Sequence, residues 1–229
     1  MERVIEIRYD NWIKYSDSVG DKNPIHRNDE DAKRYGLERV VAPGMFIASH
    51  IQKPDYIGAI KGIKFPGVVY DGDKLIINER EGKNGVDYVF RRGDDVVCKV
   101  NGVREESGTV LDSLKDRVYT YEREFWGKDL DKYLESVGCS LDLVTPEMFM
   151  ASLSASALLS YGEKIHLVGM HASQSFNVCD DYNFGEIFIG VGNERRKGPM
   201  ITCDLLWEQK DKVIASGKAL VMAFEDENS

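Results

Sequence analysis

One order of predicted elements occurs twice along this chain of 229 residues. In each copy a strand comes first, then a helix, then a buried apolar helix, and four strand-like segments complete the unit. The first strands are similar in sequence, with Arg-Val-Ile-Glu-Ile before Trp12 and Arg-Val-Tyr-Thr-Tyr before Trp126. Two units of this kind predict an α+β fold in which curved antiparallel sheets each wrap a central helix.

The predicted units are residues 1–112 and residues 113–229, and we expect them to pack as a pseudo-dimer within one chain. The first central helix is predicted at residues 45–51, with Pro43 or Gly44 in its first turn. The second is predicted as one long helix over residues 146–161. The predicted strands are residues 3–8, 60–65, 74–81, 86–92 and 96–103 in the first unit, and 117–123, 166–178, 186–194, 201–209 and 213–224 in the second.

Charge and cysteine content limit the classes of partner. A net charge of −9 and a pI near 5.1 disfavour a general nucleic-acid or anionic-membrane surface, because the mean field repels phosphate. The most apolar stretch, residues 148–159, is interrupted by serines and is too short to span a bilayer. We expect a cytoplasmic protein with no metal site, because its cysteines are widely spaced and form no Cys-x-x-Cys pair: Cys98, Cys139, Cys179 and Cys203.

The two units differ before the central helix, where the first has about a dozen more residues. That surplus contains Asp21-Lys22-Asn23-Pro24-Ile25-His26. Pro24 forbids a regular helical turn and favours an extended conformation for Asn23, so the segment is predicted to be a shaped loop. Such a loop can aim a carboxylate and an imidazole at one point, as the activation of a water molecule requires.

The run around this loop, residues 15–49, resembles the MaoC-like (R)-specific enoyl-CoA hydratases, which have a hotdog fold. Asp-x-Asn-Pro-x-His and the downstream Ala-Pro-Gly-Met carry the resemblance. It continues more loosely through Phe65-Pro66-Gly67 and through Gly72-Asp73-Lys74-Leu75. Two departures concern substrate identity: Pro43 stands where the family usually has His, and Gln52 stands where some members have Ser.

The resemblance implies a double hotdog that adds or removes water at C2–C3 of an acyl thioester. Asp21 and His26 would hold the water, and which of them takes its proton is left open. The amide of Gly44 would stabilise the enolate oxygen. The implied partner is an acyl-CoA or acyl-carrier thioester, with coenzyme A as part of the substrate and no other cofactor. Further residues expected to contact substrate are Asn23, Pro43, Met45, Ser49 and Gln52.

Two other functions fit the same expected fold. A hotdog thioesterase would hydrolyse the ligand through an acidic residue on a central helix, for which Glu147 is the best candidate. A non-catalytic acyl-CoA-binding subunit would not need the Asp21–His26 pair, and a homodimer of the chain is left open. In each case the second unit is expected to supply the wall of the acyl pocket, and we expect His166 and His171 to be core or pocket-lining residues.

Overall fold

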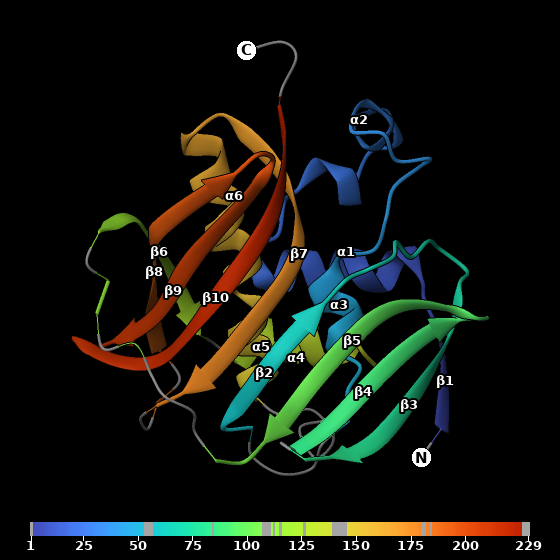
Figure 1. The fold of residues 1–229 in the computed structure, drawn as a ribbon, viewed down its shortest axis with the longest axis horizontal. Coiled ribbons are helices and arrows are strands. Elements are labelled where there is room, and N and C mark those ends of the chain that lie inside the picture. Colours follow the sequence, from blue (N-terminus) through green and yellow to red (C-terminus); the bar gives the residue numbers. More distant parts are fainter. Residues whose placement is uncertain are drawn as a thin grey trace.

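The architecture is one continuous antiparallel sheet with helices packed against it, as a computed structural model shows (Figure 1). Most helices lie behind the sheet in this view, while α2 (Asp29–Arg34) lies apart at one end. None of the helices in the described part of the chain is long and apolar enough to cross a membrane. The structure describes residues 2–52, 57–83, 85–106, 111, 113–114, 116–125, 127–138, 146–179, 182–183 and 185–225.

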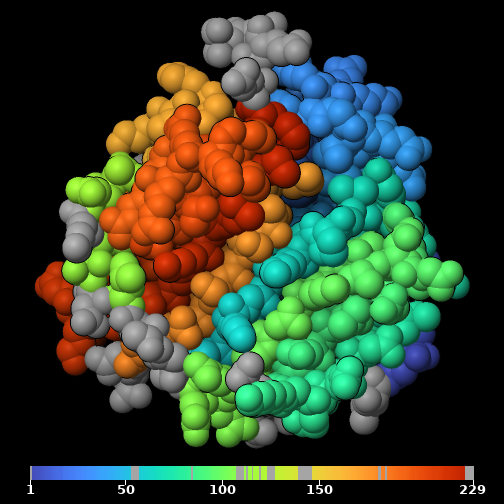
Figure 2. Space-filling view, in the orientation of Figure 1, coloured from blue at the N-terminus to red at the C-terminus, as the bar shows by residue number. Residues whose placement is uncertain are grey.

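The order of the ten strands has an internal symmetry. From one edge it runs β1-β3-β4-β5-β2, and from the other edge it runs β6-β8-β9-β10-β7. Within each unit, therefore, the first strand is at the edge and the second strand is at the centre. The two central strands, β2 and β7, pair with each other and form the seam between the units (Figure 2).

The strands follow the sequence-based expectation closely. The strands of the first unit are β1 (Glu2–Glu6), β2 (Ala59–Lys64), β3 (Lys74–Gly82), β4 (Gly85–Arg92) and β5 (Asp95–Arg104). Those of the second unit are β6 (Arg117–Phe125), β7 (Leu167–Val178), β8 (Gly185–Lys197), β9 (Met200–Gln209) and β10 (Lys212–Glu225).

The helices differ more from expectation. The long helix predicted over residues 146–161 is two helices, because Leu153 ends the first and caps the second. The first central helix is also short, at five residues. The remaining helices are α1 (Tyr9–Val19), the 3₁₀ helix η1 (Pro24–His26), α3 (Gly44–Ala48), α4 (Gly127–Ser136), α5 (Pro146–Ser152) and α6 (Ser154–Lys164).

Two short sequence repeats coincide with the repeated helices. Residues 14–20, Lys-Tyr-Ser-Asp-Ser-Val-Gly, match residues 132–138, Lys-Tyr-Leu-Glu-Ser-Val-Gly. Residues 43–49, Pro-Gly-Met-Phe-Ile-Ala-Ser, match residues 146–152, Pro-Glu-Met-Phe-Met-Ala-Ser. The predicted echo at Trp126 lies outside the described residues, so these helical repeats are the clearer sign of duplication.

The repeated residues pack against one another at the centre of the molecule. The ring of Tyr15 lies 5.4 Å from that of Phe46, and the equivalent rings of Tyr133 and Phe149 are 5.1 Å apart. The hydroxyl groups of Ser49 and Ser152 are 3.4 Å apart. The cores of the two units are therefore joined through equivalent side chains, in addition to the seam between β2 and β7.

Candidate active site

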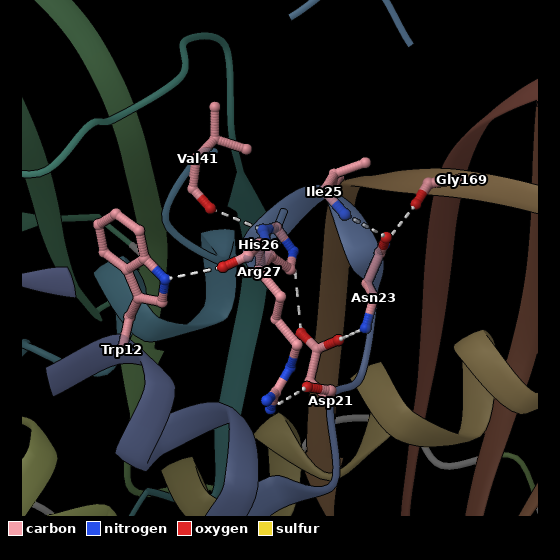
Figure 3. A network of polar contacts seen from close by, with 8 residues as sticks. All are labelled: Trp12, Asp21, Asn23, Ile25, His26, Arg27, Val41 and Gly169. Carbon is pink, nitrogen blue, oxygen red and sulfur yellow. Dashed lines mark hydrogen bonds and ion pairs between the residues drawn. The ribbon is translucent and has the colours of Figure 1, made fainter. Parts of the chain in front are cut away.

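The Asp21–His26 loop forms the first wall of the candidate site. Residues 24–26 form η1, and Asn23 before it has φ −56° and ψ 122°, the extended geometry expected before proline. The Asn23 side chain accepts a hydrogen bond from the Ile25 amide at 3.3 Å and donates one to the Gly169 carbonyl at 2.9 Å (Figure 3). Because Gly169 is in β7, one side chain both shapes the loop and attaches it to the second unit.

Asp21 and His26 face each other inside the protein. The Oδ2 atom of Asp21 lies 3.9 Å from the Nε2 atom of His26, and the two residues are only 4% and 7% exposed (Figure 3). This distance is too long for a direct hydrogen bond. It suits one water molecule that bonds to both atoms, because each such bond spans only about 2.8 Å.

The orientation of His26 follows from its other ring nitrogen. Nδ1 lies 2.7 Å from the carbonyl oxygen of Val41, which can only accept, so Nδ1 carries the proton. Nε2 then presents its lone pair toward Asp21. Burial lowers the pKa of His26 below its usual range, and the charge of Asp21 opposes that shift. The imidazole is therefore neutral at pH 7, with Nε2 able to take a proton.

The backbone fixes the second carboxylate oxygen of Asp21. Its Oδ1 atom accepts a hydrogen bond from the Asn23 amide at 3.0 Å, which leaves Oδ2 to face the imidazole. Behind the loop, the indole of Trp12 donates to the His26 carbonyl at 3.0 Å. Arg27 donates to the Asp21 carbonyl at 3.2 Å. Both functional side chains thus stand on a backbone that is held from several directions.

Gly44 lies opposite the loop, at the first position of α3. A Cβ atom added there would lie 2.7 Å from the ring of Phe65, so only glycine allows this close approach. The first amides of a helix have no acceptor within the helix, and the Gly44 amide is one of them. It can therefore donate to an oxygen atom of a ligand in the cavity.

The cavity between the loop, α3 and the second unit has a volume of about 70 Å³. Residues of α6, β7, β9 and β10 make up most of its wall, and most of these are apolar. Its lining contains six of the residues predicted for the site: Asp21, Asn23, His26, Pro43, Gly44 and Met45.

Two predicted site residues lie elsewhere. Ser49 donates to the Met45 carbonyl at 2.6 Å and faces Ser152, so its hydroxyl points toward the second central helix. Gln52, which follows α3, is also absent from the cavity lining. Of the two histidines expected in the core or the pocket lining, His171 of β7 lines the cavity, whereas His166 is exposed and outside it, so that expectation was wrong for His166. No group of three or more metal-binding side chains occurs in the described residues.

Comparison with known proteins gives matches only at the level of structure. No protein-family model and no curated protein matches the sequence. A solved MaoC-like dehydratase superposes with a TM-score of 0.64 at 14% identity, covering 98% of this chain and 96% of its own. A second, from Phytophthora capsici, gives 0.62 at 11% identity, covering 99% and 96%. This chain has the fold of the MaoC-like dehydratases.

Proteins with a thioesterase name share this MaoC-like fold. A protein from Lactobacillus plantarum, provisionally named as an oleoyl thioesterase, gives a TM-score of 0.56 at 10% identity. The match covers 98% of this chain and 95% of that protein. The fold is therefore compatible with hydration or with hydrolysis of a thioester, and the choice depends on the side chains in the cavity.

Proposed function

We propose that this protein is an (R)-specific enoyl-thioester hydratase, which also catalyses the reverse dehydration of a 3-hydroxyacyl thioester. The observation that carries the proposal is the buried Asp21–His26 pair, 3.9 Å apart, in one cavity with the Gly44 amide. The (R) stereochemistry rests on the sequence resemblance of residues 15–49. The substrate is an acyl-CoA or an acyl-carrier thioester, and no further cofactor is proposed.

In the hydration direction, a water molecule lies between Oδ2 of Asp21 and Nε2 of His26. Nε2 takes a proton from the water as its oxygen bonds to C3 of the enoyl group. The electron pair of the C2–C3 double bond moves toward the thioester carbonyl, whose oxygen accepts a hydrogen bond from the Gly44 amide. The Asp21–His26 pair then delivers one proton to C2, so the product gains H at C2 and OH at C3. Dehydration is the same sequence reversed.

The fold proposal is a double hotdog with units at residues 1–112 and 113–229. The repeated strand order and the repeated central helices support it. In this arrangement the first unit supplies the reacting groups and the second supplies most of the acyl wall. We also propose a cytoplasmic location, from the sequence alone.

The test is hydration of crotonyl-CoA. The reaction is measured by the loss of the enoyl absorbance, and the configuration of the 3-hydroxybutyryl product is determined by chiral analysis. Asp21→Asn and His26→Gln should each lower kcat by about 10²- to 10⁴-fold, the usual contribution of a positioned acid or base. Circular dichroism should stay native. Asp10→Asn, an exposed carboxylate outside this cavity, is the matched control and should keep full activity. Wild-type protein without hydratase activity would refute the proposal.

Thioester hydrolysis is the second candidate, and Glu147 of α5 is the observation that favours it. This residue is 2% exposed, and one of its carboxylate oxygens accepts a hydrogen bond from the hydroxyl of Tyr182. Its other oxygen is buried and has no partner in the described part of the chain. Release of free CoA thiol from crotonyl-CoA without loss of the enoyl group, abolished by Glu147→Gln, would establish this alternative.

A further inference from the structure

The strands of the second unit place one strongly polar side chain among the apolar residues of the cavity wall, and this group has no part in the mechanism above. His171 of β7 lines the same cavity as Asp21, His26 and Gly44. Both of its ring nitrogens are buried, and neither has a hydrogen-bond partner in the described residues. An imidazole left in this state costs free energy, because it has lost its hydration without a replacement. Such a cost calls for an explanation.

A β-bulge explains how His171 comes to face the cavity. In the pairing of β7 with β10, His171 lies opposite Val221 and Ser173 lies opposite Leu220, so Ala172 is the extra residue. Before the bulge, Leu167, Gly169 and His171 alternate onto the cavity face. Beyond it, the inward positions become Gln174, Phe176 and Val178, which are buried. The bulge thus adds a polar residue to a strand face that is otherwise mainly apolar.

The ring of His171 is placed by the first unit. It lies edge-on to Phe65 with the ring centroids 5.7 Å apart, and Phe65 is the same ring that closes over Gly44. Burial lowers the pKa of His171 to about 4, so the ring is neutral at pH 7 and offers one N–H and one acceptor nitrogen. The backbone of Ser173 lies near the ring and opposes this shift, but its geometry is poorer than that of a full hydrogen bond. The broad preference of a histidine at χ2 lets the ring turn toward a ligand at small cost.

We propose that His171 is a substrate-binding residue that donates a hydrogen bond to an oxygen atom on the acyl part of the thioester. This inference rests on the proposed function. The oxygen is either that of the thioester carbonyl or one carried further along the acyl chain, such as a hydroxyl group. No other side chain from the apolar wall formed by β7, β9 and β10 offers a strong donor to the cavity, and its lining residues there are Leu167, Gly169, Ile201, Cys203, Val221 and Ala223.

The test compares His171→Phe with the wild type on crotonyl-CoA and on 4-hydroxycrotonyl-CoA, which differ by one hydroxyl group. Phenylalanine keeps the aromatic contact and removes both nitrogens. If His171 donates to the thioester carbonyl, His171→Phe should lower kcat/KM by about 3- to 10-fold on both substrates, which is the value of one hydrogen bond. If His171 donates to an oxygen atom further along the acyl chain, the same loss should occur on the hydroxylated substrate alone. His166→Asn, an exposed histidine outside the cavity, is the control and should change neither value.

Thermal unfolding separates a binding role from a structural one. Because the nitrogens are buried without partners, His171→Phe should raise the Tm by about 2 to 4 °C. A histidine that held the fold together would instead lower the Tm on substitution. An unchanged kcat/KM on both substrates, or a lowered Tm, overturns the inference. A wild type with no hydratase activity overturns the proposed function instead, and that result is seen before any variant is made.

Discussion

The two units of this chain share their packing and differ in the residues around the candidate site. Equivalent tyrosine, phenylalanine and serine side chains meet at the centre. Between the repeated segments, however, the first unit has 22 residues, 21–42, and the second has seven, 139–145. The longer segment carries Asp21 and His26. At the start of the central helix, the first unit has Gly44 where the second has Glu147.

This comparison shows which positions the fold requires and which the chemistry requires. The positions that match in both repeats are those that fill the core, because a duplicated core needs the same volumes. Gly44 and the Asp21–His26 loop, which differ between the units, line the cavity, although Pro43 and Met45 also line it and match in both repeats. A core can therefore remain duplicated while only one unit keeps a site, and substitutions at the differing positions should affect function far more than folding.

The largest effect is expected when position 44 of the first unit is given the residue found at the equivalent position 147 of the second unit. Gly44→Glu keeps the backbone amide but its side chain would keep the thioester oxygen away from it, so hydratase activity should fall by about 10²- to 10³-fold, the usual cost of losing one donor to the oxyanion. Its Cβ would collide with Phe65 at 2.7 Å, and its carboxylate would enter the cavity. Crotonyl-CoA hydration measures the loss. Gly62→Ala is the control, since an added Cβ there meets nothing within 4 Å; full activity in Gly44→Glu would contradict the assigned role.

A smaller effect on activity is expected when the contact by which the second unit holds the loop of the first unit is removed. Asn23→Ala removes the hydrogen bonds to Gly169 and Ile25 while leaving Asp21 and His26 in place. We expect kcat/KM to fall by about 10²-fold, because small displacements of reacting groups cost that much. Asn23→Asp keeps the acceptor toward Ile25 and loses the donor toward Gly169. Its kcat/KM should lie between that of Asn23→Ala and that of the wild type. Wild-type activity in Asn23→Asp would show that the bond between the units does not position the loop.

Each unit also buries a histidine whose charging should weaken the fold. Burial lowers the pKa of His50 and of His171 to about 4, against about 6.5 when unfolded. The unfolded chain therefore binds more protons between these values, and the free energy of unfolding should decrease as the pH falls from 6.5 to 4. A pKa difference of 1 between the folded and unfolded states corresponds to about 1.4 kcal/mol in the free energy of unfolding. Urea unfolding at several pH values measures this, and His171→Phe should show a shallower decrease than the wild type.

The smallest effect is expected for Glu147→Gln, the counterpart of the Gly44 substitution in the second unit. Under the proposed hydratase, this change keeps an acceptor for the Tyr182 hydroxyl and alters no residue of the cavity lining. Hydration of crotonyl-CoA should stay close to the wild-type rate, because Glu147 is outside the cavity lining. A large loss of activity would place the chemistry in the second unit and favour hydrolysis.

Periodicity and local motifs were enough to predict the strands and the shaped loop from Asp21 to His26, because these depend on residues close together in the chain. The same holds for Gly44, whose place at the start of α3 follows from Pro43. The Asp21–His26 loop could be anticipated for the further reason that proline and asparagine shape it locally.

The rest depended on contacts between the units. The α5–α6 break at Leu153 leaves no local mark such as proline or glycine. Ser49 turns away from the cavity because Ser152, a residue 103 positions later, lies on that side. His171 faces the ligand space because of a bulge at Ala172, where β7 departs from strict alternation to pair with β10. A bulge of this kind has no reliable signature in one sequence.

The bond from Asn23 to the Gly169 carbonyl has a consequence for assembly. Since the acceptor belongs to the other half of the polypeptide, the first 112 residues produced alone would lack the anchor of their own loop. Joining both halves covalently keeps the anchor at a high effective concentration, independent of how dilute the protein is. An enzyme built in this way should not lose activity on dilution through separation of its two halves, whereas one assembled from two separate chains would.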